Sequence, residues 1–337
     1  MKKLLVIDAN SILNRCFYGV APLSAPDGLP TNAIYGMMNV LLSHIEALKP
    51  DYAAAAYDVH HPTFRHEMYT EYKAGRHETP PELLAQFPYS KEIFEAMGVH
   101  VVEKAGYEAD DILGTLSKEA EDDGGIESYI LTGDKDSLQL IGDNTFVLLA
   151  TNRETVKYDR AAFVEKYGVD PSRFVDVKAL MGDSSDNIPG VAGIGEKTAL
   201  KLISEYGDID SIYSRLSTDK HTPSLKAKLE AGEQSAYLSR TLARIKRDAP
   251  IDTPLSQIEY KGRDEAQLYS LFSRFGFSKL IAKMGLREAA AAKAVTEKRE
   301  LEDSSVDALI SLAKEKPLAV CECDGALLCA DSEHTYI

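Results

Sequence analysis

Nine acidic side chains in five segments of the chain are candidate metal ligands. One acid follows each of the apolar runs 4–7 and 52–57, and three stand together within 108–111. The other four form two pairs, at 134 and 136 and at 183 and 186, and the second pair would share a face if its segment is a helical turn. The nine candidates are Asp8, Asp58, Glu108, Asp110, Asp111, Asp134, Asp136, Asp183 and Asp186.

Carboxylates gathered in one place need cations. Two like charges about 4 Å apart repel by roughly 4 kcal/mol at an effective dielectric of about 20. Oxygen ligands without His or Cys favour Mg²⁺ or Mn²⁺, and the surplus of acids over one coordination shell indicates two ions, as in phosphodiester-cleaving enzymes. The alternative is that acids are simply common at strand ends and that capping explains one or two of those at 108–111.

A basic segment lies between the second and third apolar runs. Lys73 and Arg76 are three residues apart and would present two cations on one side of a helix, while Tyr72 offers a ring on which a base could stack. This combination suits a nucleic-acid backbone. The alternative is a solvated helix whose charges are balanced by neighbouring acids, namely Glu67, Glu71 and Glu78.

A glycine-rich turn occupies residues 190–199, Gly-Val-Ala-Gly-Ile-Gly-Glu-Lys-Thr-Ala. Glu196 interrupts the Gly-Lys-Ser/Thr of a Walker A loop, and no Rossmann fingerprint is present. The remaining interpretation is a turn that opens a helix and binds a phosphate through backbone N–H groups, with Lys197 and Lys201 adding charge. A purely structural turn between two helices is the alternative.

The elements that must position these groups follow an α/β pattern. Strands are predicted at 4–7, 52–57, 100–102, 128–131 and 146–150, and residues 33–48 carry apolar side chains at helical spacing. Such alternation predicts a mostly parallel sheet with helices on both faces, which brings the carboxyl ends of distant strands to one edge. Helical patterns dominate from 171 to 286, for example at 198–206, 225–231 and 265–275.

Four parts of the chain are therefore expected. Residues 1–175 form the α/β domain, with an arm at about 60–98, and 176–286 form a helical domain. Residues 287–300 are rich in Ala, Lys and Glu and are predicted to be a linker. Residues 301–337 contain two apolar runs but fewer residues than a stable core needs, so we interpret them as the incomplete start of a further domain.

Composition excludes several classes of protein. The chain has 337 residues, 44% of them hydrophobic and 27% charged, which is typical of a folded globular protein. Asp8 ends the first apolar run too early for a signal peptide, no run approaches a membrane span, and four cysteines give no disulfide framework. We expect a cytoplasmic protein. The net charge of -15 argues weakly against a nucleic-acid partner, because acids loaded with metal present positive charge to a phosphate.

Six motifs, in order, resemble the 5′-3′ exonuclease domain of bacterial DNA polymerase I, a member of the flap endonuclease family. They are Leu-Val-Ile-Asp at 5–8, Phe-Arg-His-Glu at 64–67, Tyr-Lys-Ala-Gly-Arg at 72–76, Tyr-Glu-Ala-Asp-Asp at 107–111, Thr-Gly-Asp-Lys-Asp at 132–136 and the run from Met181 to Ala199. The resemblance covers about residues 1–286. It implies a PIN/flap-endonuclease-like fold with a helical arch and a helix-hairpin-helix-like domain.

The resemblance also implies roles for single residues. It assigns all nine acids to two divalent ions, and Asp8, Asp58, Glu108, Asp110, Asp134 and Asp136 to catalysis together with the basic pair Lys73 and Arg76, which contacts the scissile phosphate. Residues implied to bind DNA are Arg65, Tyr72, Lys73, Arg76, Gly190, Gly193, Gly195, Lys197, Thr198 and Lys201. A monovalent cation, K⁺, is implied at the helix-hairpin-helix-like element.

The activity implied is removal of 5′ flaps and RNA primers from DNA in replication and repair, by a monomer without a membrane partner. Two alternatives stay open, a PIN-type ribonuclease and a non-catalytic DNA-binding scaffold. In the family a proofreading-type domain usually follows, but the run Val-Cys-Glu-Cys-Asp at 320–324 lacks the Asp-x-Glu of an active proofreading strand. Neither proofreading nor polymerisation is predicted from this chain.

Overall fold

The computed structural model describes residues 1–59, 61–76, 78–151, 153–218 and 222–288, and the strands 319–323, 326–330 and 335–336. The chain divides into two units, Met1–Met284 and Gly285–Ile337. The predicted linker lies outside the described residues from 289 onward, as does the first part of the predicted further domain, 301–318.

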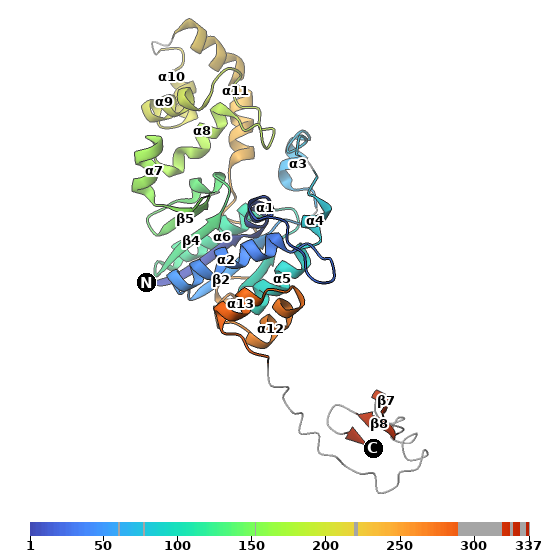
Figure 1. The fold of residues 1–337 in the computed structure, drawn as a ribbon. Helices are drawn as coiled ribbons and strands as arrows, with labels where there is room; N and C mark the ends of the chain where they lie inside the picture. The colour runs from blue at the N-terminus through green and yellow to red at the C-terminus, as the bar shows by residue number, and fades with distance from the viewer. Residues whose placement is uncertain are drawn as a thin grey trace. The chain divides into compact units, whose positions relative to one another are not determined.

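A six-stranded sheet forms the centre of the first unit (Figure 1). Its strand order is β3-β2-β1-β4-β5-β6, in which β1 to β5 are parallel and β6 is antiparallel to β5. The predicted mostly parallel sheet is confirmed, but its antiparallel edge strand was not predicted. The strands are β1 (Lys2–Asp8), β2 (Tyr52–Tyr57), β3 (His100–Glu103), β4 (Ile126–Thr132), β5 (Thr145–Ala150) and β6 (Thr155–Tyr158).

The register of the central strands sets where the acids lie. In the β1–β2 pair Asp8 is level with Ala56, and in the β1–β4 pair Ile7 is level with Leu131. Asp8 therefore stands at the carboxyl edge of the sheet, and the chain that continues from β2 and β4 leaves the sheet at the same edge.

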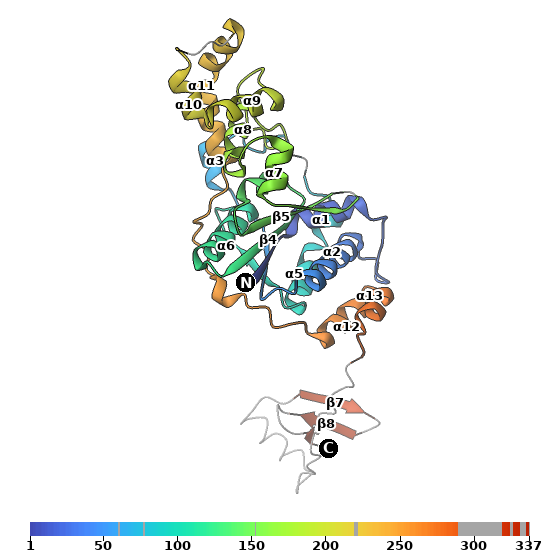
Figure 2. The same cartoon turned by 90° about the vertical axis from the view of Figure 1, so that its left-hand side faces the viewer.

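Helices cover both faces of this sheet, as predicted (Figures 1 and 2). Leu4 and Val6 of β1 share a buried core with Ile112 and Leu116, because alternate residues of a strand face the same side. That side is covered by α6 (Ala109–Asp123), and the opposite side by α1 (Ala9–Gly19), α2 (Asn32–Leu48) and α5 (Phe87–Ala96).

The predicted arm is less helical than expected. It contains α3 (Phe64–Met68) and α4 (Pro81–Leu84), and its third helix, α5, packs on the sheet. Residues 71–75 form turns, and Lys73 has a left-handed φ of 59° that no α-helix allows. The expectation that Lys73 and Arg76 share one side of a helix is therefore wrong.

A helical part follows the sheet and extends from its carboxyl edge (Figures 1 and 2). Its helices are α7 (Arg160–Tyr167), α8 (Phe174–Met181), α9 (Glu196–Tyr206), α10 (Ile209–Arg215) and α11 (Pro223–Ala243). The last two helices of the unit, α12 (Glu265–Arg274) and α13 (Ser278–Met284), lie at the other end, beside α5. Contacts between Tyr89 and Phe275 and between Tyr35 and Phe277 hold them there. The residues predicted as one helical domain, 176–286, thus occupy two places.

In the second unit the described residues after 288 form three antiparallel strands, in the order β7-β8-β9. They are β7 (Ala319–Cys323), β8 (Ala326–Ala330) and β9 (Thr335–Tyr336). Among all the described residues, none of the helices is long and apolar enough to cross a membrane.

Candidate active site

Asp8 and Asp134 are joined through a threonine hydroxyl at the carboxyl edge of the sheet. Thr132 Oγ1 donates to Asp8 Oδ2 at 2.8 Å and accepts from the Asp134 backbone N–H at 2.9 Å. The other oxygen of Asp8 caps α1 by accepting from the Ser11 N–H at 3.0 Å. These bonds hold two of the predicted ligands in place and leave the Asp134 side chain partly exposed.

The first turn of α6 brings two more acids to the same edge. The Ala109 N–H donates to Asp58 Oδ1 at 2.7 Å, so the acid after β2 is tied to the start of α6. Ser137 Oγ donates to Asp110 Oδ1 at 2.9 Å, which ties α6 to η1 (Asp136–Leu140), the 3₁₀ turn after β4.

Burial and mutual repulsion set the charges of these acids. Burial raises the pKa of Asp8 to about 7, and the carboxylates of Asp58 and Asp134 push it in the same direction. Burial likewise raises the pKa of Asp136 to about 7, with a further contribution from Asp134. The pKa of Asp110 is raised well above its usual range by burial and by its acidic neighbours. The structure therefore brings Asp8, Asp58, Asp110, Asp134 and Asp136 into one electrostatic cluster.

A buried lysine links this cluster to Asp183. Lys178 Nζ lies 2.6 Å from Asp136 Oδ1 and 2.5 Å from Asp183 Oδ2, and only 8% of the lysine side chain is exposed. Although burial opposes it, hydrogen bonds from Lys178 and Ser185 lower the pKa of Asp183. The ammonium thus pairs with two of the predicted ligands at once.

A second acidic group, Glu108 and Asp186, is bound by side chains of the arm. Lys73 Nζ lies 2.6 Å from Glu108 Oε1 and 3.9 Å from Asp186 Oδ2. Arg76 Nε donates to Asp186 Oδ1 at 3.1 Å, and the Lys73 N–H donates to the Asp186 carbonyl at 2.9 Å. The two predicted catalytic cations are therefore beside the acids, as required, but paired with them.

Tyr72 does not offer the exposed ring that was expected. It is 4% exposed and packs with Val175 and Ile188. Its one hydroxyl proton is shared between Glu108 Oε2 at 3.1 Å and Asp186 Oδ2 at 3.2 Å. Stacking on a base needs a free ring face. The structure instead gives Tyr72 the role of positioning the two carboxylates.

Arg65 and Asp111 form a buried ion pair beside Glu108, whose Oε2 lies 3.3 Å from Arg65 Nη1. Arg65 Nη1 and Nη2 donate to the two oxygens of Asp111 at 2.7 and 2.8 Å, and the Lys246 N–H donates to Asp111 Oδ1 at 2.8 Å. Arg65 is 2% exposed and Asp111 is 0% exposed. Both oxygens of Asp111 are engaged and Arg65 is covered, so the predictions of a metal ligand and a DNA contact are not supported here.

Asp183 and Asp186 do not share a helical face. The chain between them is a tight turn closed by hydrogen bonds in both directions between Asp183 and Ile188, at 2.9 and 2.8 Å. Asn187 takes a left-handed φ of 55° within it. The turn sends Asp183 to Lys178 and Asp186 to Arg76.

The glycine turn leads directly into α9. A Cβ on Gly190 would lie 2.3 Å from the Gly182 nitrogen, so the two backbones approach as only glycine permits. The predicted DNA contacts Gly193, Gly195, Lys197, Thr198 and Lys201 are exposed in this turn and on the first turns of α9. This exposed placement is consistent with a phosphate contact.

The donor set suits Mg²⁺ or Mn²⁺ by its chemistry, since it consists of carboxylate oxygens whose mutual repulsion raises their pKa values. Among the described residues, however, no three His, Cys, Asp or Glu side chains already stand as a ligand set for one ion. Lys73, Arg76 and Lys178 occupy neighbouring positions as counter-charges. Metal binding would therefore require some of these carboxylates to reorient.

Two family models match the chain in succession. Residues 3–168 match the model described as 5′-3′ exonuclease, N-terminal resolvase-like domain, and residues 169–266 match 5′-3′ exonuclease, C-terminal SAM fold. The chain belongs to the 5′-3′ exonuclease family. The resemblance drawn from the motifs is confirmed.

Curated relatives of this 5′-3′ exonuclease family member are bacterial DNA polymerases I. That of Caldicellulosiruptor bescii is 39% identical over 343 residues, which cover 99% of this chain and 40% of the relative. That of Bacillus subtilis strain 168 is 41% identical over 307 residues, covering 90% of this chain and 34% of the relative. The chain thus spans at most 40% of the length of these two relatives.

Solved structures share the fold at low sequence identity. T5 5′-exonuclease with zinc bound is 24% identical with a TM-score of 0.59, covering 72% of this chain and 89% of that one. The catalytic core of Rad2 in complex with a DNA substrate is 17% identical with a TM-score of 0.57, covering 85% of this chain and 91% of that one. These likenesses confirm the predicted fold class.

Three residues at the site were not predicted from the sequence. Thr132 positions Asp8 and Asp134, Ser137 positions Asp110, and Lys178 pairs with two acids. Thr132 stands inside the Thr-Gly-Asp-Lys-Asp motif, so the sequence did carry a signal for it. Lys178 had none, because its partners are determined by the packing of α8 against η1.

Proposed function

We propose that this chain is a structure-specific 5′ nuclease that hydrolyses phosphodiester bonds in DNA bearing a 5′ flap or a primer. The observation that carries the proposal is the gathering of acids from five segments at one sheet edge, with Lys73 and Arg76 beside them. Membership of the 5′-3′ exonuclease family supports the same reaction class.

The acids proposed to hold two divalent ions, Mg²⁺ or Mn²⁺, are Asp8, Asp58, Glu108, Asp110, Asp134, Asp136, Asp183 and Asp186. When bound, such ions would neutralise the acids, activate water and stabilise charge on the phosphate. Thr132, Ser137 and Lys178 hold members of this set in place before the ions arrive. Asp111 is not part of this set, because Arg65 and the Lys246 N–H engage both of its oxygens.

Lys73 and Arg76 bind the reacting phosphate in this proposal. Both cations now pair with acids that would face metal, Lys73 with Glu108 and Arg76 with Asp186. If bound metal ions neutralised Glu108 and Asp186, Lys73 and Arg76 could each exchange a carboxylate for a phosphate oxygen. Arginine suits a bidentate contact with a phosphate, whereas lysine acts as a point charge.

The glycine turn and α9 are proposed to bind the duplex through Gly190, Gly193, Gly195, Lys197, Thr198 and Lys201. Two carbonyls of this turn, where K⁺ is expected, already accept hydrogen bonds. The Gly190 carbonyl accepts from Ser235 Oγ at 2.6 Å, and the Gly193 carbonyl accepts from Lys228 Nζ at 3.1 Å. A monovalent cation that used the Gly193 carbonyl would have to displace the Lys228 ammonium. Lys228→Ala should therefore make duplex binding more responsive to K⁺.

One assay separates this proposal from its alternatives. With Mg²⁺, the purified chain should cut a 5′-flap DNA faster than single-stranded RNA, and EDTA should abolish cutting. Faster cutting of the RNA would favour a PIN-type ribonuclease. Tight flap binding without cutting in Mg²⁺ or Mn²⁺ would favour a non-catalytic scaffold. A monomeric state, a cytoplasmic location and a role in replication and repair are parts of the same proposal.

A further inference from the structure

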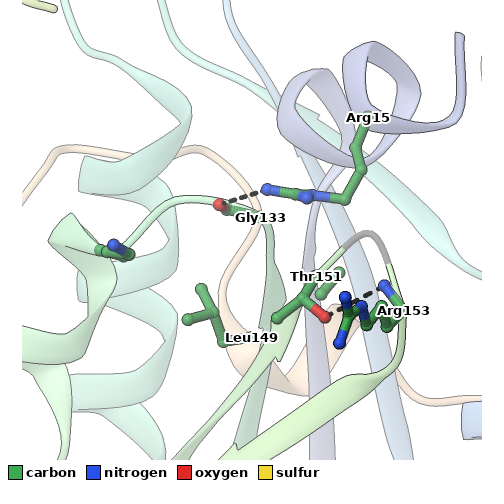
Figure 3. A pocket seen from close by; sticks show the side chains of 7 residues that line it. Arg15, Gly133, Leu149, Thr151 and Arg153 are labelled. Atoms are coloured by element: carbon green, nitrogen blue, oxygen red, sulfur yellow. Dashed lines mark hydrogen bonds between the residues drawn. The ribbon is translucent and has the colours of Figure 1, made fainter. Parts of the chain in front are cut away.

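A pocket of about 380 Å³ opens beside the carboxyl ends of β4 and β5 (Figure 3). Three of the residues that line it are basic: Arg15 from α1, Lys135 from the turn after β4, and Arg153 from the turn between β5 and β6. No acidic residue and no aromatic ring belongs to the lining. None of these residues was predicted from the sequence to take part in function.

The charge of this pocket is unusual for the molecule. The chain carries a net charge of -15, yet three cations meet here. Among the described residues, no ion pair involves Lys135 or Arg153. By contrast, the basic residues closest to the acids are all paired with carboxylates, namely Arg65, Lys73, Arg76 and Lys178. Lys135 and Arg153 therefore have charge to offer to an anion from outside.

The backbone around the pocket is built to hold its cations in place. Arg15 Nη2 donates to the Gly133 carbonyl at 3.1 Å, as the dashed line in Figure 3 marks. A Cβ on residue 133 would lie 2.6 Å from Arg15 Nε, so the missing side chain of Gly133 makes room for the guanidinium. On the other side, Thr151 Oγ1 accepts from the Arg153 N–H at 3.3 Å and shapes the turn that carries Arg153.

The pocket borders the acid cluster on the side away from the arm. Gly133 and Lys135 flank Asp134 in the chain, whereas the arm connects β2 and β3, on the other side of β1 in the sheet. A strand that crosses the carboxyl edge would therefore meet Lys73 and Arg76 on one side of the acids and this pocket on the other.

We propose that Arg15, Lys135 and Arg153 form a subsite for a backbone phosphodiester of the nucleic-acid strand, next to the phosphate that reacts. The inference rests on the proposed nuclease function and extends it to three residues. The absence of an aromatic ring from the lining argues against a base as occupant, since bases are bound by stacking. Phosphate contacts of this kind position a strand and do not read its sequence.

Salt dependence of binding tests the subsite directly. Binding of a 5′-flap DNA is measured in EDTA at several salt concentrations for the wild type and for Lys135→Ala/Arg153→Ala. Each phosphate contact adds roughly 0.7 to 0.9 to the slope of log affinity against log salt. We expect weaker binding and a slope smaller by about 0.7 to 0.9 in the double variant, since the contact with one phosphate is lost.

A matched control removes the same charge elsewhere. Lys279 and Lys283 are exposed on α13, at the end of the unit away from α8–α11 (Figure 1). Lys279→Ala/Lys283→Ala should keep the wild-type slope. Arg153→Lys should retain most of the slope that Arg153→Ala loses, because the contact is a phosphate and not a base.

Each outcome has one meaning. If the wild type binds and cuts flap DNA while the double variant and the control have equal slopes, the subsite is refuted and the nuclease stands. If the wild type neither binds nor cuts flap DNA, the proposed function fails first. A third outcome concerns inorganic phosphate. If it raises the melting temperature of the wild type but not of the double variant, while the DNA slopes of the two are equal, the pocket is a site for free anions and the strand contact is refuted.

Discussion

At the residue scale, Lys73 forms a short ion pair with Glu108, and this contact places the lysine ammonium beside the acids. In the proposed reaction its partner becomes the scissile phosphate, so its charge acts mainly as the transition state forms. Lys73→Ala should lower the single-turnover rate by about 10²- to 10³-fold, the range found when one stabilising group is removed. Affinity for flap DNA in EDTA should change far less. Lys197→Ala is the contrasting variant, because we expect it to lower the affinity for flap DNA more than the rate.

Equal losses of rate and affinity in Lys73→Ala would contradict that role. The lysine would then be one of several cations that hold DNA, and the acids would act on a phosphate positioned by other groups.

Arg65 and Asp111 carry the second prediction at this scale. Breaking a buried ion pair leaves one charge without a partner and reduces stability by about 3–5 kcal/mol. Arg65→Ala and Asp111→Asn should both lower the free energy of unfolding by an amount of that size, measured by urea denaturation. Arg263→Ala breaks a more exposed pair with Glu265 and should lower it by only about 0–1 kcal/mol. Unchanged stability in Asp111→Asn would contradict a structural role for this ion pair.

At the scale of elements, the ends of the strands could be predicted from the sequence. The hydrogen-bond and ion-pair partners of the acids could not. The runs 4–7 and 52–57 are continuous and apolar, and an acid ends each, so local sequence was enough to place Asp8 and Asp58. Asp110 and Asp111 are neighbours on α6 and point about 100° apart, so only one can face the cluster. Which one does so depends on Arg65, a partner 46 residues away, which local patterns cannot reveal.

The short helix α8 and the turn after it show the same limit. Sequence indicated the pair Asp183 and Asp186 but not the tight turn that separates them. The arm likewise has the predicted cations, but Lys73 takes a left-handed conformation because its N–H is fixed by the Asp186 carbonyl. A tight local turn in the first segment and a long-range hydrogen bond in the second overrode helical spacing.

The glycine turn supplies a prediction for this scale. Gly190 has a φ of 60°, and an added Cβ would meet the backbone of Gly182, which cannot move aside as a flexible side chain can. Gly190→Ala should lower the free energy of unfolding by about 1–3 kcal/mol, as overpacking does. Gly195→Ala is the control, because its φ is -99° and no atom lies within 4 Å of the added carbon. Equal stability of the two variants, measured by thermal unfolding, would show that the close approach of the two backbones is not needed.

At the scale of the whole molecule, charge is distributed unevenly. A chain with a net charge of -15 concentrates acids at one sheet edge and places basic groups around them. This arrangement explains why net charge alone is a poor guide to the partner. The acids repel one another unless cations are bound between them, and this repulsion makes the stability of the fold depend on pH.

Raised acid pKa values make the metal-free protein less stable as pH rises. Asp8 and Asp136 have pKa values of about 7 in the fold, above those of unfolded acids, so the folded state binds more protons between about pH 4 and 7. Their contribution is present below pH 4 and is lost as pH rises through 7. In EDTA, the melting temperature should therefore fall from pH 5 to pH 8, and Asp8→Asn should reduce this fall. Mn²⁺ should raise the melting temperature more at pH 8 than at pH 5.

Two results would contradict this. The melting temperature in EDTA could rise from pH 5 to pH 8, or Mn²⁺ could raise the melting temperature more at pH 5 than at pH 8. Either result would mean that the acids do not destabilise the fold by repelling one another. The cluster would then be an ordinary set of solvated carboxylates.

Binding of Mn²⁺, followed by electron paramagnetic resonance, tests most directly whether these acids form a metal centre. The wild type should bind two ions per chain, and Asp134→Asn should bind fewer or bind them far more weakly. Asp252→Asn, which removes an exposed acid paired with Lys104, should bind as the wild type does. Equal Mn²⁺ binding by the wild type and Asp134→Asn, or no specific binding by the wild type, would contradict the account.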